Sequence, residues 1–156
     1  MKRNSGIFFS LCILLVLSAC STGPVFDETP EISFVSISPG PVQQFQDEFV
    51  ITIHFQDGDG DLGDDNEEVR NLFVRHTIPG LDTVAYDFKI PNLTPDTKNP
   101  SIQGNIDITV SAPPLSSFIP GNPPVTEEEA IFRVWLMDRA GNVSNEILTD
   151  PILIVQ

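Results

Sequence analysis

Cysteine is almost absent from this sequence. The two cysteines, Cys12 and Cys20, both lie near the N-terminus. The rest of the chain therefore has no disulfide and no cysteine that could serve as a nucleophile or a metal ligand. A domain that folds after Cys20 must be stabilised by core packing, by backbone pairing or by a bound ion.

Positive charge is also scarce. After Lys2 and Arg3 the chain has six basic side chains against 22 acidic ones, a formal charge of −16. Nucleic-acid binding depends on basic residues that neutralise phosphates, so this balance argues against it. The same negative charge opposes direct electrostatic docking on anionic lipid.

Signatures of catalysis are missing as well. The sequence has no Gly-x-Ser-x-Gly elbow and no phosphate-binding loop, so we expect a non-catalytic protein. A hydrolytic enzyme with a pair of carboxylates is an alternative, because Asp and Glu are abundant. A glycan-binding module is another, although one Trp and one Tyr offer little surface for sugar stacking.

A short hydrophobic run lies near the N-terminus. Lys2 and Arg3 precede apolar residues 7–17, which are too few to span a bilayer and are typical of a signal peptide. The next residues, Leu17-Ser18-Ala19-Cys20, resemble the lipobox of bacterial lipoproteins. This resemblance implies cleavage before Cys20 and lipidation of Cys20, and Ser21 in the next position favours the Gram-negative outer membrane. An ordinary secretory signal or an uncleaved anchor would also place the domain outside the cytoplasm.

These features divide the chain into three parts. Residues 1–19 form the predicted signal peptide, residues 20–30 the lipidated cysteine and linker, and residues 31–156 one domain. Two or more acyl chains hold a protein stably on a bilayer. Ten extended residues reach at most about 35 Å, so the linker is a short tether. The expected partners are the membrane, through the lipid, and a protein or glycan at the cell envelope.

Alternating apolar residues punctuated by Gly and Pro predict an all-β domain. This domain is expected to be a two-sheet sandwich. We predict seven strands, at residues 31–38, 48–55, 71–78, 83–90, 105–111, 130–137 and 147–155.

The segment after the sixth predicted strand carries a resemblance. Asp138-Arg139-Ala140-Gly141-Asn142-Val143-Ser144 follows a hydrophobic strand and precedes the last one. Together with the strand pattern over residues 31–156, it resembles the immunoglobulin-like and fibronectin type III-like modules of bacterial surface proteins. The resemblance implies a seven-stranded Greek-key β-sandwich. Trp135 lies on the sixth strand rather than the third, so antibody-type features do not carry over.

An acidic stretch follows the second predicted strand. Seven carboxylates and no basic residue lie between Asp57 and Glu68. Two carboxylates about 6 Å apart repel by roughly 3 kcal/mol at an effective dielectric constant near 20, so folding several of them together requires a cation. Hard oxygen ligands at alternate positions suit Ca²⁺. A solvated loop is the alternative.

The run Asp57, Asp59 and Asp61 resembles the first three ligand positions of an EF-hand calcium loop. Glu68 falls at the twelfth position, but the sixth, usually Gly, is Leu62. No helices flank the run, so we expect a calcium loop on a β scaffold instead. The predicted ligands are listed in order of expectation: Asp57, Asp59, Asp61, then Asp138, then Asp64 or Asp65.

Asp138 is a candidate ligand because of the predicted topology. In a Greek-key sandwich the loops after the second, fourth and sixth strands cluster at one end, so Asp138, Asn142 and Asn145 could reach the ion. Asp138 to Asn142 could instead make a simple hairpin turn.

Three other features have alternative interpretations. His54 and His76 could bind Zn²⁺, but we interpret them as surface residues. Asp82-Thr83-Val84 resembles a bacterial O-glycosylation motif. In the long loop 112–129, Leu115, Phe118 and Ile119 could form a contact surface, although we favour a role in capping the core.

Overall fold

The computed structural model describes residues 25–78, 81–94 and 101–156. The predicted signal peptide, Cys20 and the first part of the predicted tether lie outside these ranges. The structure also does not describe the side chains of residues 81–83, so the predicted glycosylation site at Thr83 is not described either. Among the described residues, no helix is long and apolar enough to cross a membrane. Nearly all regular structure is β, which confirms the all-β prediction. The elements are β1 Glu31–Ser38, β2 Val42–Gln43, β3 Glu48–Asp57, β4 Leu72–Ile78, β5 Leu81–Phe88, β6 Ile102–Ser111, the short 3-10 helix η1 Ser116–Phe118, β7 Glu127–Ala130, β8 Arg133–Leu136, β9 Ile147–Leu148 and β10 Ile152–Val155.

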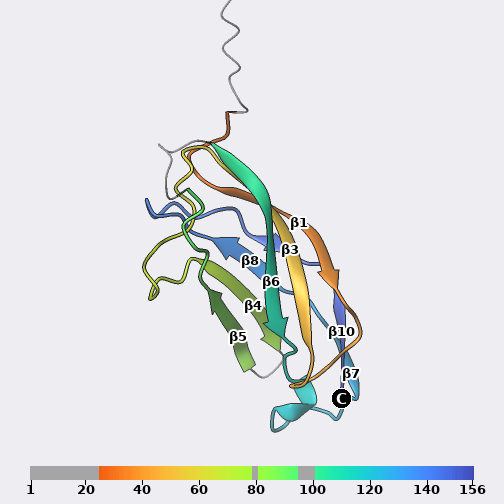
Figure 1. Ribbon diagram of the computed structural model, residues 1–156. Helices are drawn as coiled ribbons and strands as arrows, with labels where there is room; N and C mark the ends of the chain where they lie inside the picture. Colours follow the sequence, from red (N-terminus) through yellow and green to blue (C-terminus); the bar gives the residue numbers. More distant parts are fainter. Residues whose placement is uncertain (1–24, 79–80, 95–100) are drawn as a thin grey trace, which may run out of the picture.

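The strands form three sheets that pack together. One sheet has the order β1-β3-β6, a second β5-β4-β8-β9, and a small third sheet β2-β10-β7. In Figure 1 the first sheet lies across from the second, and β7 and β10 lie at the end away from the start of β1. The parallel pairing of β2 with β10 joins the start of the domain to its last strand.

Strand β3 is the central element of the first sheet. Its residues alternate between the core and the outer face, with Phe49, Ile51, Ile53 and Phe55 buried. It pairs with β1 on one side and with β6 along its whole length on the other. On the outer face Thr52 donates a hydrogen bond to Asp107 of β6 at 2.7 Å, a cross-strand pair that helps to fix the register.

The core lies between the sheets. The Phe49 ring packs against Phe132, with centroids 5.1 Å apart, and both side chains are fully buried. Leu115, in the long loop after β6, is also buried and caps the core, as we favoured. Phe118 in the same loop is instead 65% exposed.

The last part of the chain corrects the seven-strand prediction. The predicted strand 130–137 is mainly β8, β7 lies mostly in the predicted loop 112–129, and the predicted strand 147–155 is divided into β9 and β10. β7 pairs with β10, but β8 pairs with β4 in another sheet, so the chain changes sheets at Ile131 and Phe132. Pro151 lies in the corresponding break between β9 and β10. Hydrogen bonds between Phe132 and Thr149 join the two crossings. Because the residues at the crossing are apolar like most of the predicted strand 130–137, the sequence does not indicate that the strand is interrupted there.

Candidate metal centre

The site begins at the end of β3. Asp57 follows Phe49, Ile51, Ile53 and Phe55 at the same two-residue spacing, and it is the last residue of the strand. Because side chains alternate along a strand, Asp57 points to the same side as these core residues. Its residue exposure is 0%, so a carboxylate is buried at the end of an apolar row.

The loop after β3 folds back toward Asp57. The Leu62 side chain is fully buried, and its backbone N–H donates to Asp57 Oδ2 at 2.9 Å. Gly63 has φ +88°, and a Cβ at this position would collide with the Pro91 carbonyl, so only glycine suits the turn. The turn therefore requires a glycine at position 63, one residue after the sixth position of the EF-hand pattern. For this reason Leu62 can occupy that sixth position.

This path brings three carboxylates together. One oxygen from each of Asp57, Asp59 and Asp61 lies within 4.8 Å of the others, which confirms that this group could hold a metal ion. Asp61 is 8% exposed and Asp59 is half-buried. The Oδ1 atom of each of the three is buried and has no hydrogen-bond partner. Buried polar atoms normally have partners, and a cation bound by this group could supply one to these oxygens.

Electrostatics supports the same interpretation. The pKa of Asp57 is raised to about 6, mainly by burial and also by the charges of Asp59 and Asp61, against the lowering effect of the Leu62 N–H. Burial also raises the pKa of Asp61, with contributions from the charges of Asp138 and Asp59. A cation among these oxygens would offset both the burial and the repulsion.

Asp138 lies near the group but has other partners. It is 5% exposed, and its charge acts on Asp61. Both of its carboxylate oxygens accept hydrogen bonds from Asn142, from the backbone N–H and from the side-chain amide, each at 2.8 Å. Asp138 therefore closes the turn between β8 and β9, which was the alternative role predicted for it. Asn145 binds both backbone groups of Ile32 instead of facing the carboxylates.

The other predicted ligands lie outside the group. Asp64 Oδ1 accepts the N–H of Asn66, and Asp65 Oδ2 accepts the side-chain amide of Asn92. Glu68, at the twelfth position of the calcium-loop pattern, is exposed. The loop after Gly63 thus turns its carboxylates toward its own backbone, toward the β5–β6 connection and toward solvent.

Three loops meet around the acidic run, as the topology predicted. The Thr94 hydroxyl donates to the Gly60 carbonyl at 2.6 Å. The Ala140 N–H donates to Asp61 Oδ2 at 3.0 Å, and the Arg139 guanidinium donates to the Gly63 carbonyl. Sequence analysis missed these supporting residues. Most of these contacts involve a backbone group, and the pattern of side chains in the sequence does not reveal backbone contacts.

A fourth segment also reaches the site. The Gly58 N–H donates to the Asp27 carbonyl at 2.7 Å, so residues just before β1 lie against the acidic loop. Figure 1 shows the N-terminal segment entering at this end of the molecule, beside the loops.

The glycines of the run have a second possible meaning. Gly58, Gly60 and Gly63 follow a strand with the Gly-x-Gly-x-x-Gly spacing of dinucleotide-binding turns. In such turns a helix N-terminus receives the phosphates. Residues 58–71 are all described and contain no helix, and aspartates stand between the glycines, so the loop suits a cation rather than a phosphate.

Neither histidine lies in the carboxylate group. His54 Nδ1 is 2.9 Å from Asn105 Oδ1 on the outer face of the first sheet. His76 corrects our prediction of a surface residue. It is 8% exposed, it lies on the inward row of β4 with Val74 and Ile78, and its ring contacts Phe132. The two residues lie on strands of different sheets.

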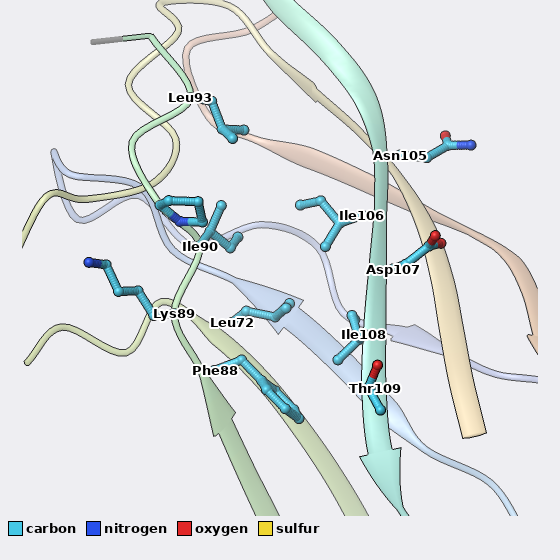
Figure 2. A pocket seen from close by; sticks show the side chains of 11 residues that line it. Leu72, Phe88, Lys89, Ile90, Leu93, Asn105, Ile106, Asp107, Ile108 and Thr109 are labelled. Atoms are coloured by element: carbon cyan, nitrogen blue, oxygen red, sulfur yellow. The ribbon is translucent and has the colours of Figure 1, made fainter. Parts of the chain in front are cut away.

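A cavity of about 410 Å³ opens beside the site, between the edges of the two main sheets. Figure 2 shows Ile106 and Ile108 of β6 on one side and Leu72, Phe88 and Ile90 on the other. Asp107 points away from the cavity, toward its partner Thr52. The cavity is therefore apolar and separate from the carboxylate group.

The single Trp lies on the outward side of the second sheet. Trp135 stacks on Phe73 with centroids 5.4 Å apart, and the Arg75 guanidinium lies over both rings. A sugar that stacked on this side would have to displace Arg75, which also pairs with Asp87 at 2.6 Å.

No family model, curated protein or solved structure matches this chain. The assignment of a role to the site therefore depends on its geometry and chemistry.

Proposed function

We propose that this protein is a non-catalytic binding or accessory module of the cell envelope whose loop end is held together by a structural Ca²⁺. Two observations on the same three residues carry the proposal: one oxygen from each of Asp57, Asp59 and Asp61 lies within 4.8 Å of the others, and the Oδ1 atom of each is buried without a hydrogen-bond partner. The ion would join the β3–β4 loop to the two loops that contact it, and so it would stiffen the surface that they form.

Calcium suits the donors better than other common ions. All three donors are hard carboxylate oxygens, which are ligands for Ca²⁺, Mg²⁺ and Mn²⁺ rather than for Zn²⁺ or copper. Two oxygens on one Ca²⁺ can be up to about 5 Å apart, given bond lengths of 2.3–2.6 Å. The oxygens of the triad lie within 4.8 Å of one another. Mg²⁺ binds at shorter distances in a strict octahedron and gives up its waters reluctantly, so we expect it to bind more weakly.

The same geometry is less suited to hydrolysis. Paired carboxylates in glycosidases stand roughly 5 to 9.5 Å apart, with a sugar between them. Here the oxygens are closer, and Asp57 is fully buried. A cation fits between them better than a substrate does.

We further propose an immunoglobulin-like Greek-key arrangement. The strand order supports it: β3 is beside β6, and β4 is beside β8, so strands distant in sequence are neighbours within each sheet. Immunoglobulin constant-type domains place their fourth strand next to the fifth. In this chain the fourth main strand, β5, pairs with β4 instead.

Attachment to the membrane through lipid on Cys20 is the remaining part of the proposal. It is supported by the sequence Leu17-Ser18-Ala19-Cys20 and by the hydrophobic run before it. Lipidation would place the sandwich at the envelope surface, most simply at the outer membrane, with a protein or glycan as its partner.

A thermal melt tests the metal site. The chain from residue 21 onward is melted in EDTA, in millimolar MgCl₂ and in millimolar CaCl₂. Binding to the native state alone stabilises it by about 2.7 kcal/mol at a hundredfold excess over Kd, which for a domain of this size raises Tm by roughly 8–13 °C. We expect this rise with calcium and a smaller one with magnesium.

Two variants make the test specific. Asp59→Asn combined with Asp61→Asn should abolish the calcium-dependent rise. Glu68→Gln, which removes an exposed carboxylate from the same run, should leave it unchanged. An equal rise in the double variant, or no rise in the parent protein, would refute the site.

A further inference from the structure

Residues 25–29 precede the first sheet and contact the acidic loop, whereas Pro30, directly before β1, is buried. β1 begins at Glu31, which pairs with Gln56. Before it, Val25 is 89% exposed and Phe26 is half-buried. The bond from the Gly58 N–H to the Asp27 carbonyl is the only backbone hydrogen bond between this segment and other described residues.

Gly58 is the contact point because it has no side chain. A Cβ at this position would collide with the carbonyl oxygens of both Phe26 and Asp27. The two carbonyls therefore pack directly on the backbone of Gly58, between two members of the carboxylate group, Asp57 and Asp59. Movement of these two residues would move Gly58, and with it the N–H that holds Asp27.

Without a cation, the carboxylates of Asp57, Asp59 and Asp61 repel one another across a site with little water. With a cation, the three are drawn to one point, and the backbone between Asp57 and Asp61 is fixed. The position of the Gly58 N–H thus depends on the occupancy of the site.

We propose that ion binding at Asp57, Asp59 and Asp61 clamps residues 25–29 onto the domain through Gly58. The inference rests on the proposed metal site. With the ion bound, the tether ends at residue 25. Without it, the tether extends to residue 29, and its reach grows by roughly 14 Å, given about 3.3–3.6 Å for each extended residue. Calcium would then set how far, and how rigidly, the domain stands from its attachment point.

Cleavage by chymotrypsin after Phe26 measures the clamp. The chain from residue 21 onward suits this test, because every buried core side chain lies between Ile32 and Ile154. We expect millimolar CaCl₂ to slow cleavage at this bond roughly fivefold to tenfold relative to EDTA. Cleavage follows the population of the open form, and one hydrogen bond changes that population by about this factor. A free peptide of residues 21–30 corrects for any effect of calcium on the protease.

Gly58→Ala separates the clamp from the metal site, because it keeps all three carboxylates but places a methyl group against the Phe26 and Asp27 carbonyls. We expect this variant to keep its calcium-dependent rise in Tm while cleavage after Phe26 becomes fast and independent of calcium. Gly121→Ala, where a Cβ would meet nothing within 4 Å, is the control for adding a methyl group at a glycine. Its positive φ should lower its Tm, but the rise in Tm with calcium and the effect of calcium on cleavage after Phe26 should match those of the parent protein.

The outcomes are distinguishable. If calcium raises the Tm of the parent protein but does not change cleavage after Phe26, the clamp is wrong and the metal site stands. Calcium-dependent protection that persists in Gly58→Ala would also overturn the clamp. If calcium raises no Tm, both the metal site and the clamp fail.

Discussion

Replacing Asp57 with Asn should make the metal-free protein more stable. The substitution keeps the shape of the side chain and leaves one oxygen to accept the Leu62 N–H, the bond that Asp57 Oδ2 now makes at 2.9 Å. The new amide takes the place of an oxygen that is buried without a partner, and it can donate to the neighbouring carboxylates. Asp57→Asn thus removes a buried charge without leaving a new polar atom unsatisfied.

The magnitude follows from the pKa. A rise from 3.8 to about 6 corresponds to roughly 3 kcal/mol of destabilisation near neutral pH, at about 1.4 kcal/mol per unit. Much of this should be recovered in Asp57→Asn when no metal is present. For a domain of this size, each kcal/mol changes Tm by roughly 3–5 °C, so we expect the variant to melt several degrees above the parent protein in EDTA.

The assay is a pair of melting curves near neutral pH, in EDTA and in millimolar CaCl₂. Calcium should raise the Tm of the parent protein and change that of Asp57→Asn much less, so the advantage of the variant shrinks or vanishes. Glu68→Gln is the control for loss of one negative charge, and it should change neither curve appreciably. An Asp57→Asn protein that melts below the parent in EDTA would refute our account of the buried charge.

Two further predictions concern pH and the turn. In EDTA the parent protein should become more stable as pH falls from about 6 to about 4, because the folded state binds the Asp57 proton more tightly than the unfolded state does. In calcium the same change should destabilise it by displacing the ion, and guanidine unfolding at several pH values would detect either sign; a metal-free protein whose stability falls over this range would contradict the raised pKa. Gly63→Ala should cost several times the roughly 1 kcal/mol expected of Gly121→Ala, because both glycines have positive φ but only at Gly63 would a Cβ strike a neighbouring carbonyl; equal losses in urea unfolding would show that the contact with Pro91 is unimportant.

The sequence predicted the parts of the fold that depend on local periodicity. The alternation in β3 identified the strand, and the same alternation carried to Asp57 places a carboxylate on the buried row. The i, i+2, i+4 spacing of Asp57, Asp59 and Asp61 identified the group that the structure brings together.

The remaining assignments depended on partners that a linear pattern does not contain. Asp138 was predicted from its loop position, and the sequence pattern did not show that both of its oxygens accept hydrogen bonds from Asn142, a residue of the same turn. His76 interrupts the apolar row of β4, which led us to interpret it as a surface residue, yet it is buried on that row. The sequence does not show that the chain crosses between sheets at Phe132, because this apolar, buried residue would fit a continuous strand equally well.

The separation of the chain ends has a mechanical consequence. In Figure 1 the N-terminal segment enters at the loop end, whereas the C-terminus lies at the opposite end, after β10. β10 is held by parallel pairing to β2 and by antiparallel pairing to β7. A pull between the two ends therefore runs along the strands and loads these hydrogen bonds together in shear, instead of opening them one after another. Under such a load, residues 25–29 would release before β10, because they share a single backbone hydrogen bond with other described residues, at Gly58.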